Sequence, residues 1–348
     1  MDKIITLKDV SKEFKVLNRR EGLKGSIRDL LSRDYTIVRA VSHITMDIVK
    51  GEIVGYLGPN GAGKSTTIKM MTGVLEPTNG EIFVNGRIPY KKRTQNAQEI
   101  GVVFGQRSQL WWALPVIESF KILKDIYQVN DKAYQDMMEL YSTLVDLESL
   151  LHKPVRQLSL GQRTLCDILA AFLHNPSVVF LDEPTIGLDV SMKSKIRELI
   201  KTLNKEKEST IILTTHDMGD VDALCKRIVI IDKGALLYDD DINNLKRFFG
   251  SYRTFQVMFE ENNNNIIKGS TDDISSIIEH KLRDEFPNAT SLTVNENEEW
   301  IEILIKEDEV LLMNILNTIQ NNYRIKDMKL KEISTESIIK KIYEGGLL

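Results

Sequence analysis

Short apolar runs alternate with segments of helical periodicity over the first two thirds of the chain. Runs at 52–57, 100–104, 177–183 and 210–215 have the length of strands, and the run at 177–183 is apolar on both faces before it ends in two carboxylates. Helical spacing follows at 66–72 and at 191–207. Strands that alternate with helices predict an α/β fold with a mostly parallel sheet.

Further patterns surround this core. Segments 4–10, 44–48 and 81–86 read as strands, the last ending in the turn Asn85-Gly86, and 228–238 reads as a hairpin around Lys233-Gly234. Residues 115–152 repeat apolar side chains at helical spacing. We therefore predict a helical subdomain over about 108–172.

Near residue 245 the pattern changes. The remaining chain reads as four strand-like and two helix-like segments in the order β-α-β-β-α-β, which fits a ferredoxin-like module. A last helix carries Ile338, Ile339 and Ile342, with Thr335 as its cap, and the Asn run 262–265 reads as an exposed turn. We expect a larger α/β domain over 1–245 and an α+β accessory or regulatory domain over 246–348.

Composition narrows the function. The 348 residues carry a formal net charge of -4, which gives no general attraction to nucleic acid, and no apolar run reaches the roughly 20 residues that cross a bilayer. Two cysteines, Cys166 and Cys225, fit reduced core thiols. We expect a cytosolic protein whose membrane contact is peripheral. The basic stretch 15–33, with six basic and two acidic residues, fits a lipid or partner contact or a solvated insertion.

The clearest chemistry lies at Gly58-x-x-x-x-Gly63-Lys64-Ser65, between a predicted strand and a predicted helix. Glycines let the backbone N–H groups wrap around phosphates, the lysine reaches the β- and γ-phosphates, and the serine hydroxyl ligates Mg²⁺. We predict that ATP is bound by the loop residues and the first helical residues, namely Gly58, Pro59, Asn60, Gly61, Ala62, Gly63, Lys64, Ser65 and Thr66.

A second group of residues adds a hydrolytic function. Asp182, at the end of a parallel strand, is placed to hold Mg²⁺ together with Ser65, and Glu183 is the candidate general base for the attacking water. Structural capping of the following turn is the alternative for these carboxylates. We therefore predict an ATP hydrolase that uses ATP and Mg²⁺.

These motifs together resemble the ATP-binding cassette (ABC) ATPases, over about residues 4–240. Ser159-Leu160-Gly161-Gln162 resembles the family signature, and Gln106, Asp189 and His216 match the loop glutamine, the D-loop aspartate and the switch histidine; Tyr35 matches the aromatic that stacks on adenine. The resemblance implies a P-loop fold with a mostly parallel core sheet, an antiparallel β subdomain and a helical subdomain. It also implies that Glu183, His216 and Gln106 are catalytic and that Gln106 joins Ser65 and Asp182 at Mg²⁺.

The signature suggests that the site is shared between two copies. Ser159 to Gln162 open a helix, which makes a second anion-binding end in the same chain. In the family this end meets ATP bound by the opposite subunit, so the resemblance implies an ATP-dependent homodimer or a pair with a paralogous cassette. Leu160 replaces the family's usual second glycine, and we expect it to alter packing at the dimer seam.

We predict the ATPase subunit of a transporter, most simply an exporter, acting with a separate membrane-spanning permease at the inner face of the cell membrane. Trp111 and Trp112 are either its docking surface or core residues. A soluble cassette ATPase acting on ribosomes or nucleic acid is the alternative. Such relatives carry two cassettes or long coiled coils, whereas only 93 residues separate Ser65 from Ser159 here. The C-terminal domain, for its part, is a candidate ligand-sensing or dimer-regulating module.

Overall fold

The computed structural model describes residues 2–17, 35–104, 107–248, 252–260, 274–297, 299–306, 308–332 and 335–343. By its internal contacts the chain divides into two units, Met1–Ile242 and Asn243–Leu348, which we call the N-terminal and C-terminal units. None of the helices within these described ranges is both long enough and apolar enough to cross a membrane.

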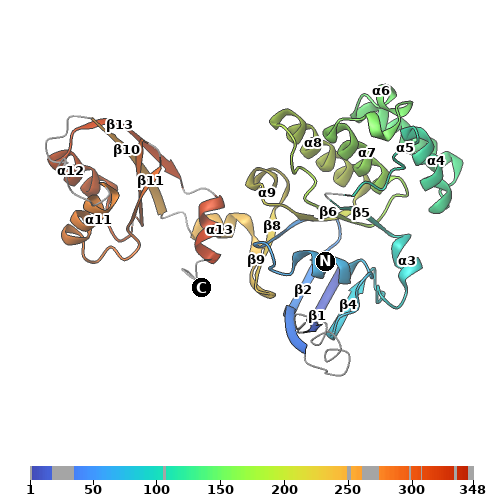
Figure 1. Ribbon diagram of the computed structural model, residues 1–348, viewed down its shortest axis with the longest axis horizontal. Coiled ribbons are helices and arrows are strands. Elements are labelled where there is room, and N and C mark those ends of the chain that lie inside the picture. Colours follow the sequence, from blue (N-terminus) through green and yellow to red (C-terminus); the bar gives the residue numbers. More distant parts are fainter. Residues whose placement is uncertain are drawn as a thin grey trace, which may run out of the picture. The chain divides into compact units, whose positions relative to one another are not determined.

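The centre of the N-terminal unit is a six-stranded sheet in the order β5-β6-β7-β3-β8-β9 (Figure 1). Neighbouring strands from β5 to β8 run parallel, and β9 pairs antiparallel with β8. The strands are β3 (Ile53–Leu57), β5 (Ile100–Phe104), β6 (Val178–Asp182), β7 (Thr210–Thr214), β8 (Arg227–Asp232) and β9 (Ala235–Asp241). All of β7 is buried, as expected for a central parallel strand, so the predicted α/β fold is confirmed.

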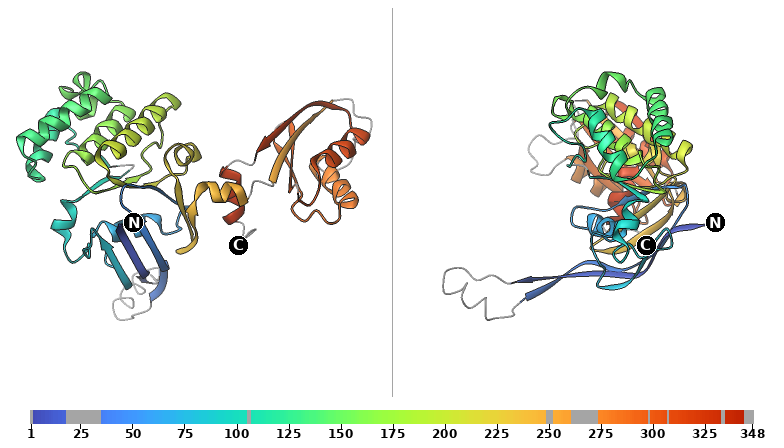
Figure 2. Two further views of the ribbon diagram at one scale, coloured as in Figure 1. Left: turned by 180° about the vertical axis from the view of Figure 1, so that it is seen from behind. Right: turned by 90° about the vertical axis from the view of Figure 1, so that its right-hand side faces the viewer.

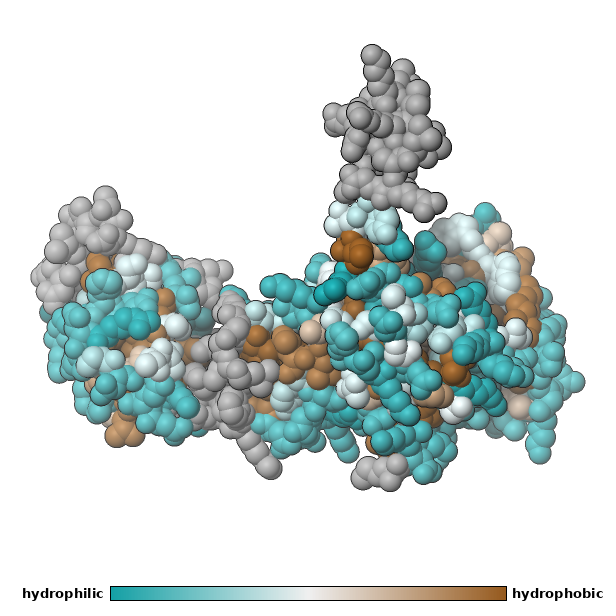
Figure 3. All heavy atoms as spheres, turned by 90° about the horizontal axis from the view of Figure 1, so that it is seen from below, coloured by the Kyte–Doolittle hydropathy of each residue, from teal (hydrophilic) through white to brown (hydrophobic). Residues whose placement is uncertain are grey.

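A second sheet is antiparallel, in the order β2-β1-β4. It consists of β1 (Lys3–Leu17), β2 (Tyr35–Val49) and β4 (Asn79–Val84), and its apolar face joins the core of the parallel sheet. Beyond the core, β1 and β2 continue as a two-stranded ribbon (Figure 2). Hydrophobic side chains are exposed on this ribbon, and Figure 3 shows hydrophobic surface on it in brown. They are Phe14, Val16, Ile37 and Val38.

Helices cover the parallel sheet and extend the unit to one side. They are α2 (Lys64–Met71), α3 (Arg93–Ala97), α4 (Val116–Ile126), α5 (Asp131–Leu144), α6 (Glu148–Leu151), α7 (Leu160–Phe172), α8 (Val190–Lys207) and α9 (Met218–Leu224). Helices α4, α5 and α6 lie together in both Figure 1 and Figure 2, so the helical character predicted for 115–152 is confirmed. The hydroxyl of Tyr141 donates to the carbonyl of Leu169 at 2.6 Å and ties α5 to α7.

The C-terminal unit contains a four-stranded antiparallel sheet in the order β11-β12-β10-β13. Along the chain its elements follow α10 (Ile242–Phe248) and are β10 (Tyr252–Phe259), α11 (Ile274–Glu285), β11 (Thr293–Asn297), β12 (Trp300–Lys306), α12 (Leu312–Asn322), β13 (Ile325–Glu332) and α13 (Thr335–Tyr343). The predicted order β-α-β-β-α-β is confirmed. Thr335 is the first residue of α13 rather than its cap, and the run 262–265 lies outside the described residues.

Both cysteines are buried and free, as predicted for core thiols. Burial raises the pKa of the Cys166 thiol to about 12, and burial also raises the pKa of Cys225. A thiol that stays protonated at neutral pH is a poor nucleophile and a poor metal ligand. These residues therefore serve the packing of the N-terminal unit.

Candidate functional site

The phosphate loop connects β3 to α2, in the strand–loop–helix setting that its motif requires. Glycine is required at two positions because no side chain fits. A Cβ on Gly58 would lie 2.6 Å from the carbonyl oxygen of Ile231, and a Cβ on Gly63 would lie 2.4 Å from that of Ala40. Gly63 also has a φ of 104°, in the left-handed region that favours glycine.

Lys64 is the buried cation of the loop. Its ammonium donates to the carbonyl oxygens of Gly58 and, at 3.2 Å, of Pro59, so it lies within the curve of its own loop. Burial lowers the pKa of Lys64, and the charges of Glu183 and Asp182 act in the opposite direction. Lys64 therefore lies within electrostatic range of both carboxylates.

The rest of the loop is open to solvent. Asn60, Gly61 and Ser65 are exposed, whereas Ala62 is buried and Thr66 is half-buried. The hydroxyl of Ser65 is available at the first turn of α2. Free backbone N–H groups at this helix end favour an anion.

Asp182 is the last residue of β6 and Glu183 follows it, and both are held by Thr214 at the end of the neighbouring strand β7. The hydroxyl of Thr214 donates to Asp182 Oδ1 at 2.5 Å, and the backbone N–H of Glu183 donates to the carbonyl of Thr214 at 3.0 Å. Glu183 has a φ of 55°. A non-glycine residue in this region is strained and points to a positional role.

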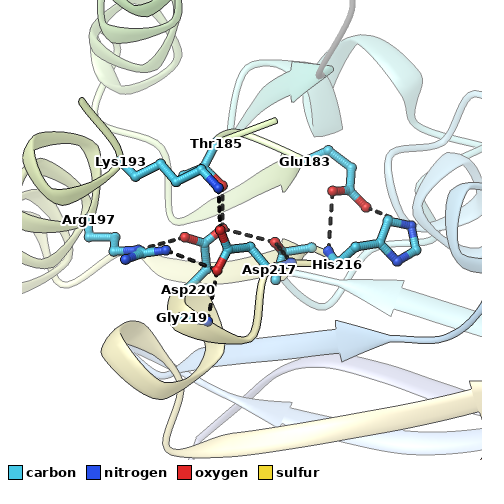
Figure 4. Close-up of polar contacts among 9 residues, drawn as sticks. Glu183, Thr185, Lys193, Arg197, His216, Asp217, Gly219 and Asp220 are labelled. Atoms are coloured by element: carbon cyan, nitrogen blue, oxygen red, sulfur yellow. Dashed lines mark hydrogen bonds and ion pairs between the residues drawn. The ribbon is translucent and has the colours of Figure 1, made fainter. Parts of the chain in front are cut away.

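Glu183 faces His216 (Figure 4). The backbone N–H of His216 donates to Glu183 Oε2 at 3.3 Å, and His216 Nε2 lies 3.2 Å from Glu183 Oε1. Burial raises the pKa of the Glu183 carboxyl, while His216 and Lys64 draw it down. A carboxylate with a raised pKa is a stronger proton acceptor, which suits a general base.

The chemistry of the donors fits Mg²⁺. Asp182 and Ser65 offer a carboxylate and a hydroxyl oxygen, and Mg²⁺ is usually held by one or two such groups together with water and substrate phosphates. Within the described residues there is no cluster of three His, Cys, Asp or Glu side chains that would form an all-protein metal site. The third predicted ligand, Gln106, lies outside the described residues.

The signature residues form a capping box at the start of α7. The backbone N–H of Ser159 donates to Gln162 Oε1 at 3.0 Å, and the N–H of Gln162 donates to Ser159 Oγ at 3.2 Å. Gly161 is buried against Met192, and the side chain of Leu160 is 42% exposed. The helix end is therefore rigid and open to solvent.

The loop after Glu183 lies beside the signature. A Cβ on Gly187 would lie 3.3 Å from Leu160 Cδ2, so the two residues are neighbours. The D-loop residue Asp189 caps α8 by accepting from the N–H of Met192 at 3.0 Å. Ile186 and Val190 expose 50% and 84% of their surface, which adds two apolar side chains to the face that carries Leu160.

A cleft of about 290 Å³ separates the signature helix from the residues that follow β5. Its lining includes Arg107, Trp112, Leu160, Arg163 and Glu183. Trp111 and Trp112 are 38% and 57% exposed, so the alternative that they are core residues is wrong. The guanidinium of Arg163 lies 5.6 Å from the centre of the Trp112 ring.

Asp167 ties α7 to the residues after 106. Its Oδ1 accepts from the hydroxyl of Ser108 at 2.8 Å and from the N–H of Gln109 at 3.1 Å. Burial raises the pKa of this carboxyl to about 6, against the effect of these two donors and of Arg163. Asp167 and Ser108 both line the cleft, so these hydrogen bonds hold part of its wall in place.

Tyr35 opens β2, five residues before the Ala40 carbonyl that touches the phosphate loop. Its ring is 42% exposed, and the Lys15 ammonium lies 5.0 Å from the ring centre. The predicted stacking on adenine stays a prediction. Of the basic stretch 15–33, residues 18–33 lie outside the described residues.

Phe14 is an exposed aromatic that the sequence analysis did not consider. It pairs with Val38, two residues from Ala40, whereas Tyr35 pairs with Leu17. Because neighbouring residues of a strand point to opposite faces, Phe14 and Tyr35 lie on opposite faces of the ribbon. The register between β1 and β2 would have identified Phe14, because it pairs this residue with Val38, on the far side of the intervening segment of about twenty residues.

Comparison with known proteins agrees with this geometry. The family model described as "ABC transporter" matches residues 41–186. The ABC transporter ATP-binding protein NatA of Bacillus subtilis is 34% identical over 209 residues, which are 60% of this chain and 85% of NatA. The cholesterol transporter ABCA5 of Rattus norvegicus is 32% identical over 235 residues, which are 67% of this chain but only 14% of ABCA5.

A solved structure supports the same relation. It is the dimeric, post-hydrolysis state of the ATP-binding cassette MJ0796 bound to ADP and Pi. That structure aligns with a TM-score of 0.56 at 25% identity, over 68% of this chain and 98% of MJ0796. The aligned share corresponds in length to the N-terminal unit.

Proposed function

The chain belongs to the ABC transporter ATP-binding proteins, and on this premise we propose that its ATP site is composite: the phosphate-loop helix end of one copy binds the phosphates, and the signature helix end of a second copy completes the site. The protein is the ATP-binding and ATP-hydrolysing subunit of a transporter. Our proposal concerns the residues that perform the reaction and the partners that the subunit meets. The observation that supports the assignment of the reacting residues is the position of the Glu183 carboxylate, which faces His216 and is coupled electrostatically to Lys64.

We assign the reaction steps to residues around the phosphate loop. Lys64 and the loop N–H groups would bind the β- and γ-phosphates, Asp182 and Ser65 would hold Mg²⁺, and Glu183 would accept a proton from the attacking water. His216 orients Glu183 and bonds the γ-phosphate, and Gln106 completes the site. Bound Mg²⁺ would neutralise charge on the phosphates.

The second copy would supply its signature. One γ-phosphate does not need two helix ends from one chain, whereas the exposed Ser159 end suits a phosphate held by another copy. Leu160, Ile186 and Val190 form an exposed apolar set around the D-loop, which supports a contact between copies there. Asp189 would lie within that contact.

For adenine we favour Phe14 over Tyr35. Along a strand the rise is about 3.3 Å per residue, so Tyr35 lies about 16 Å from Ala40, whereas Val38, the cross-strand partner of Phe14, lies about 7 Å from Ala40. Ala40 marks the phosphate loop, because its carbonyl contacts Gly63. An adenine bound next to the loop is therefore within reach of Phe14.

A membrane-spanning permease subunit is the partner that we propose for the cleft at Trp112. Exposed aromatic side chains beside a cleft are typical of protein interfaces. The subunit would then act at the inner face of the membrane, with export as the direction, and we expect no nucleic-acid partner. We propose that the C-terminal unit is an accessory module that regulates the cassette dimer.

The substitution Glu183→Gln tests the assignment of the base. It should lower kcat by about 100- to 10,000-fold, since an amide cannot accept the proton, while ATP binding persists and an ATP-bound dimer accumulates. ATP turnover and light scattering measure the two effects. Glu139→Gln, an exposed residue on α5, is the matched control and should match the wild type. Wild-type turnover in the Glu183 variant would refute the assignment.

A further inference from the structure

A fully buried carboxylate lies beside the catalytic pair without belonging to it. Asp220, in the first turn of α9, has 0% exposed surface. Its Oδ1 accepts from Arg197 Nε at 2.6 Å, and its Oδ2 accepts from the hydroxyls of Thr185 at 2.5 Å and Thr215 at 2.9 Å (Figure 4). A charged group buried at this depth persists only when it is paired and hydrogen-bonded, and here two of the three partners, Arg197 and Thr185, come from other segments.

The three donors connect the segments that carry the reacting groups. Thr185 is two residues after Glu183, and Thr215 directly precedes His216. One carboxylate therefore holds both sides of the Glu183–His216 contact. If Asp220 lost its hydrogen bond to Thr185 or to Thr215, it would no longer fix the position of Glu183 or of His216, respectively.

The same network continues on the other side of His216. Asp217 accepts from Lys193 Nζ at 2.5 Å and from Arg197 Nη2 at 3.2 Å, and it caps α9 by accepting from the N–H of Gly219 at 2.8 Å. The residues that flank His216 are thus both held by polar contacts. Its own ring is 49% exposed, so packing does not fix it.

Helix α8 supplies both cations of this network. Lys193 and Arg197 follow Asp189 at intervals of four residues, which places them along one face of the helix. Asp189 caps that helix at the end where we place the second copy. A displacement of α8 caused by that contact would be passed to His216 through Arg197 and Asp220.

We infer that Asp220 and Arg197 are positioning residues that hold His216 opposite Glu183 and couple this pair to helix α8. The inference rests on the proposed roles of Glu183 and His216. Within the part of the chain that the structure describes, the hydrogen bonds of Asp220 and Arg197 do not reach the phosphate loop. Their effect should therefore fall on turnover and not on nucleotide affinity.

The substitution Asp220→Asn is the first test. Asparagine has the same size but one acceptor oxygen, so its amide would face either Arg197 or the two threonine hydroxyls. We expect kcat to fall by about 10- to 100-fold, the loss that a misplacement of about 1 Å can cause, while KM for ATP changes by less than about threefold. Rates are expressed per ATP bound, so that a loss of folded protein does not count as a loss of kcat.

Two further variants distinguish a positioning role of Asp220 and Arg197 from a role in stability alone. Asp239→Asn breaks the half-buried pair of Asp239 with Arg227, in which Arg227 Nε donates at 2.7 Å, on strands away from the switch. It should lower stability and leave kcat unchanged. Arg197→Lys keeps the charge but cannot serve Asp217 and Asp220 with one planar fork, and should recover only part of the rate that Arg197→Ala loses.

The decisive comparison is the double variant of His216→Ala and Asp220→Asn. If Asp220 acts through His216, the double variant turns over no more slowly than His216→Ala alone, because coupled residues are not additive. Independent, multiplying losses would overturn the inference, and so would an unchanged kcat in Asp220→Asn. If Asp220→Asn fails to fold, Thr185→Val and Thr215→Val replace it, and unchanged kcat in both would overturn the inference.

The outcome also separates this inference from the proposed function. If Glu183→Gln and His216→Ala keep the wild-type rate, the proposed catalytic roles fail whatever Asp220 does. If those two variants lose turnover and the Asp220 and threonine variants do not, only the positioning role fails.

Discussion

The phosphate loop and segment 215–220 follow neighbouring parallel strands, β3 and β7, but different kinds of contact hold them. The loop is fixed by its own backbone: Gly58 and Gly63 pack against carbonyl oxygens, and Lys64 bonds carbonyls of the loop itself. Segment 215–220 is fixed by side chains from α8 and from the loop after β6.

This difference implies that the two regions determine different properties, ATP affinity and turnover. A backbone cradle keeps its shape when a distant side chain changes, so the loop should set the affinity for ATP. A segment held by buried charged side chains depends on each of them, because removing one partner leaves another unsatisfied. Variants of the loop and the ribbon should therefore change binding, whereas variants of segment 215–220 should change turnover.

The largest effect on ATP affinity is expected from Gly63→Ala. A Cβ there would lie 2.4 Å from the Ala40 carbonyl oxygen at a φ of 104°, so the loop must move. If about 3 kcal/mol of strain opposes the binding shape, ATP affinity falls by about 150-fold. Titration of ATP into the purified protein measures this.

Gly61→Ala is its matched control. Gly61 has a φ of 83°, but no atom lies within 4 Å of its would-be Cβ, so only the backbone strain of about 1–2 kcal/mol remains. Its loss of affinity should be roughly tenfold. Equal losses in the two variants would show that close contact with Ala40 is not what the loop requires.

A smaller effect is expected from Phe14→Ala. Stacking of an aromatic ring on a base contributes about 1–3 kcal/mol, so Kd for ATP should rise by about tenfold while kcat at saturating ATP stays unchanged. Tyr35→Ala, on the opposite face of the ribbon, is the control and should leave Kd unchanged. The reverse pattern would restore Tyr35 as the stacking residue, and a fall in kcat would break the division between binding and turnover.

The same contrast explains what the sequence could predict. The phosphate loop is contiguous, so eight residues identify it, and the strand and helix that flank it follow from local periodicity. The C-terminal order β-α-β-β-α-β was predicted for the same reason, because each element has its own pattern.

Phe14 and Asp220 were missed because their environments are long-range. The register of β1 against β2 contains shifts near Lys12, which no local pattern reveals. Asp220 meets Thr185 across 35 residues and Arg197 across 23. Taken alone, the aspartate reads as an ordinary polar residue in the first turn of a helix, and only the fold shows that it is buried.

The smallest effect is expected from Asp217→Asn, which leaves the cap of α9 in place, since asparagine caps as well as aspartate. What is lost is the charge that pairs with Lys193 and Arg197. We expect kcat to fall by only about two- to fivefold, less than for Asp220→Asn, because Asp217 lies nearer the surface and surface pairs contribute about 1 kcal/mol or less. Asp217→Ala also removes the cap and should cost about 1 kcal/mol more in the free energy of unfolding.

The pH dependence of stability gives an independent check on the ion pairs that Asp217 forms with Lys193 and Arg197. Burial alone would raise the pKa of Asp217, but the contacts from Lys193, Gly219 and Arg197 hold it below the ordinary value of 3.8. A lowered folded pKa contributes stability that is present above pH 3.8 and is lost as the pH falls through the folded pKa. The stability difference between the wild type and Asp217→Asn should therefore be constant from pH 7 to about 5 and shrink below about 4. Urea unfolding across this range measures it, and a difference that shrinks already between pH 7 and 5 would show that the carboxylate is not held by these cations.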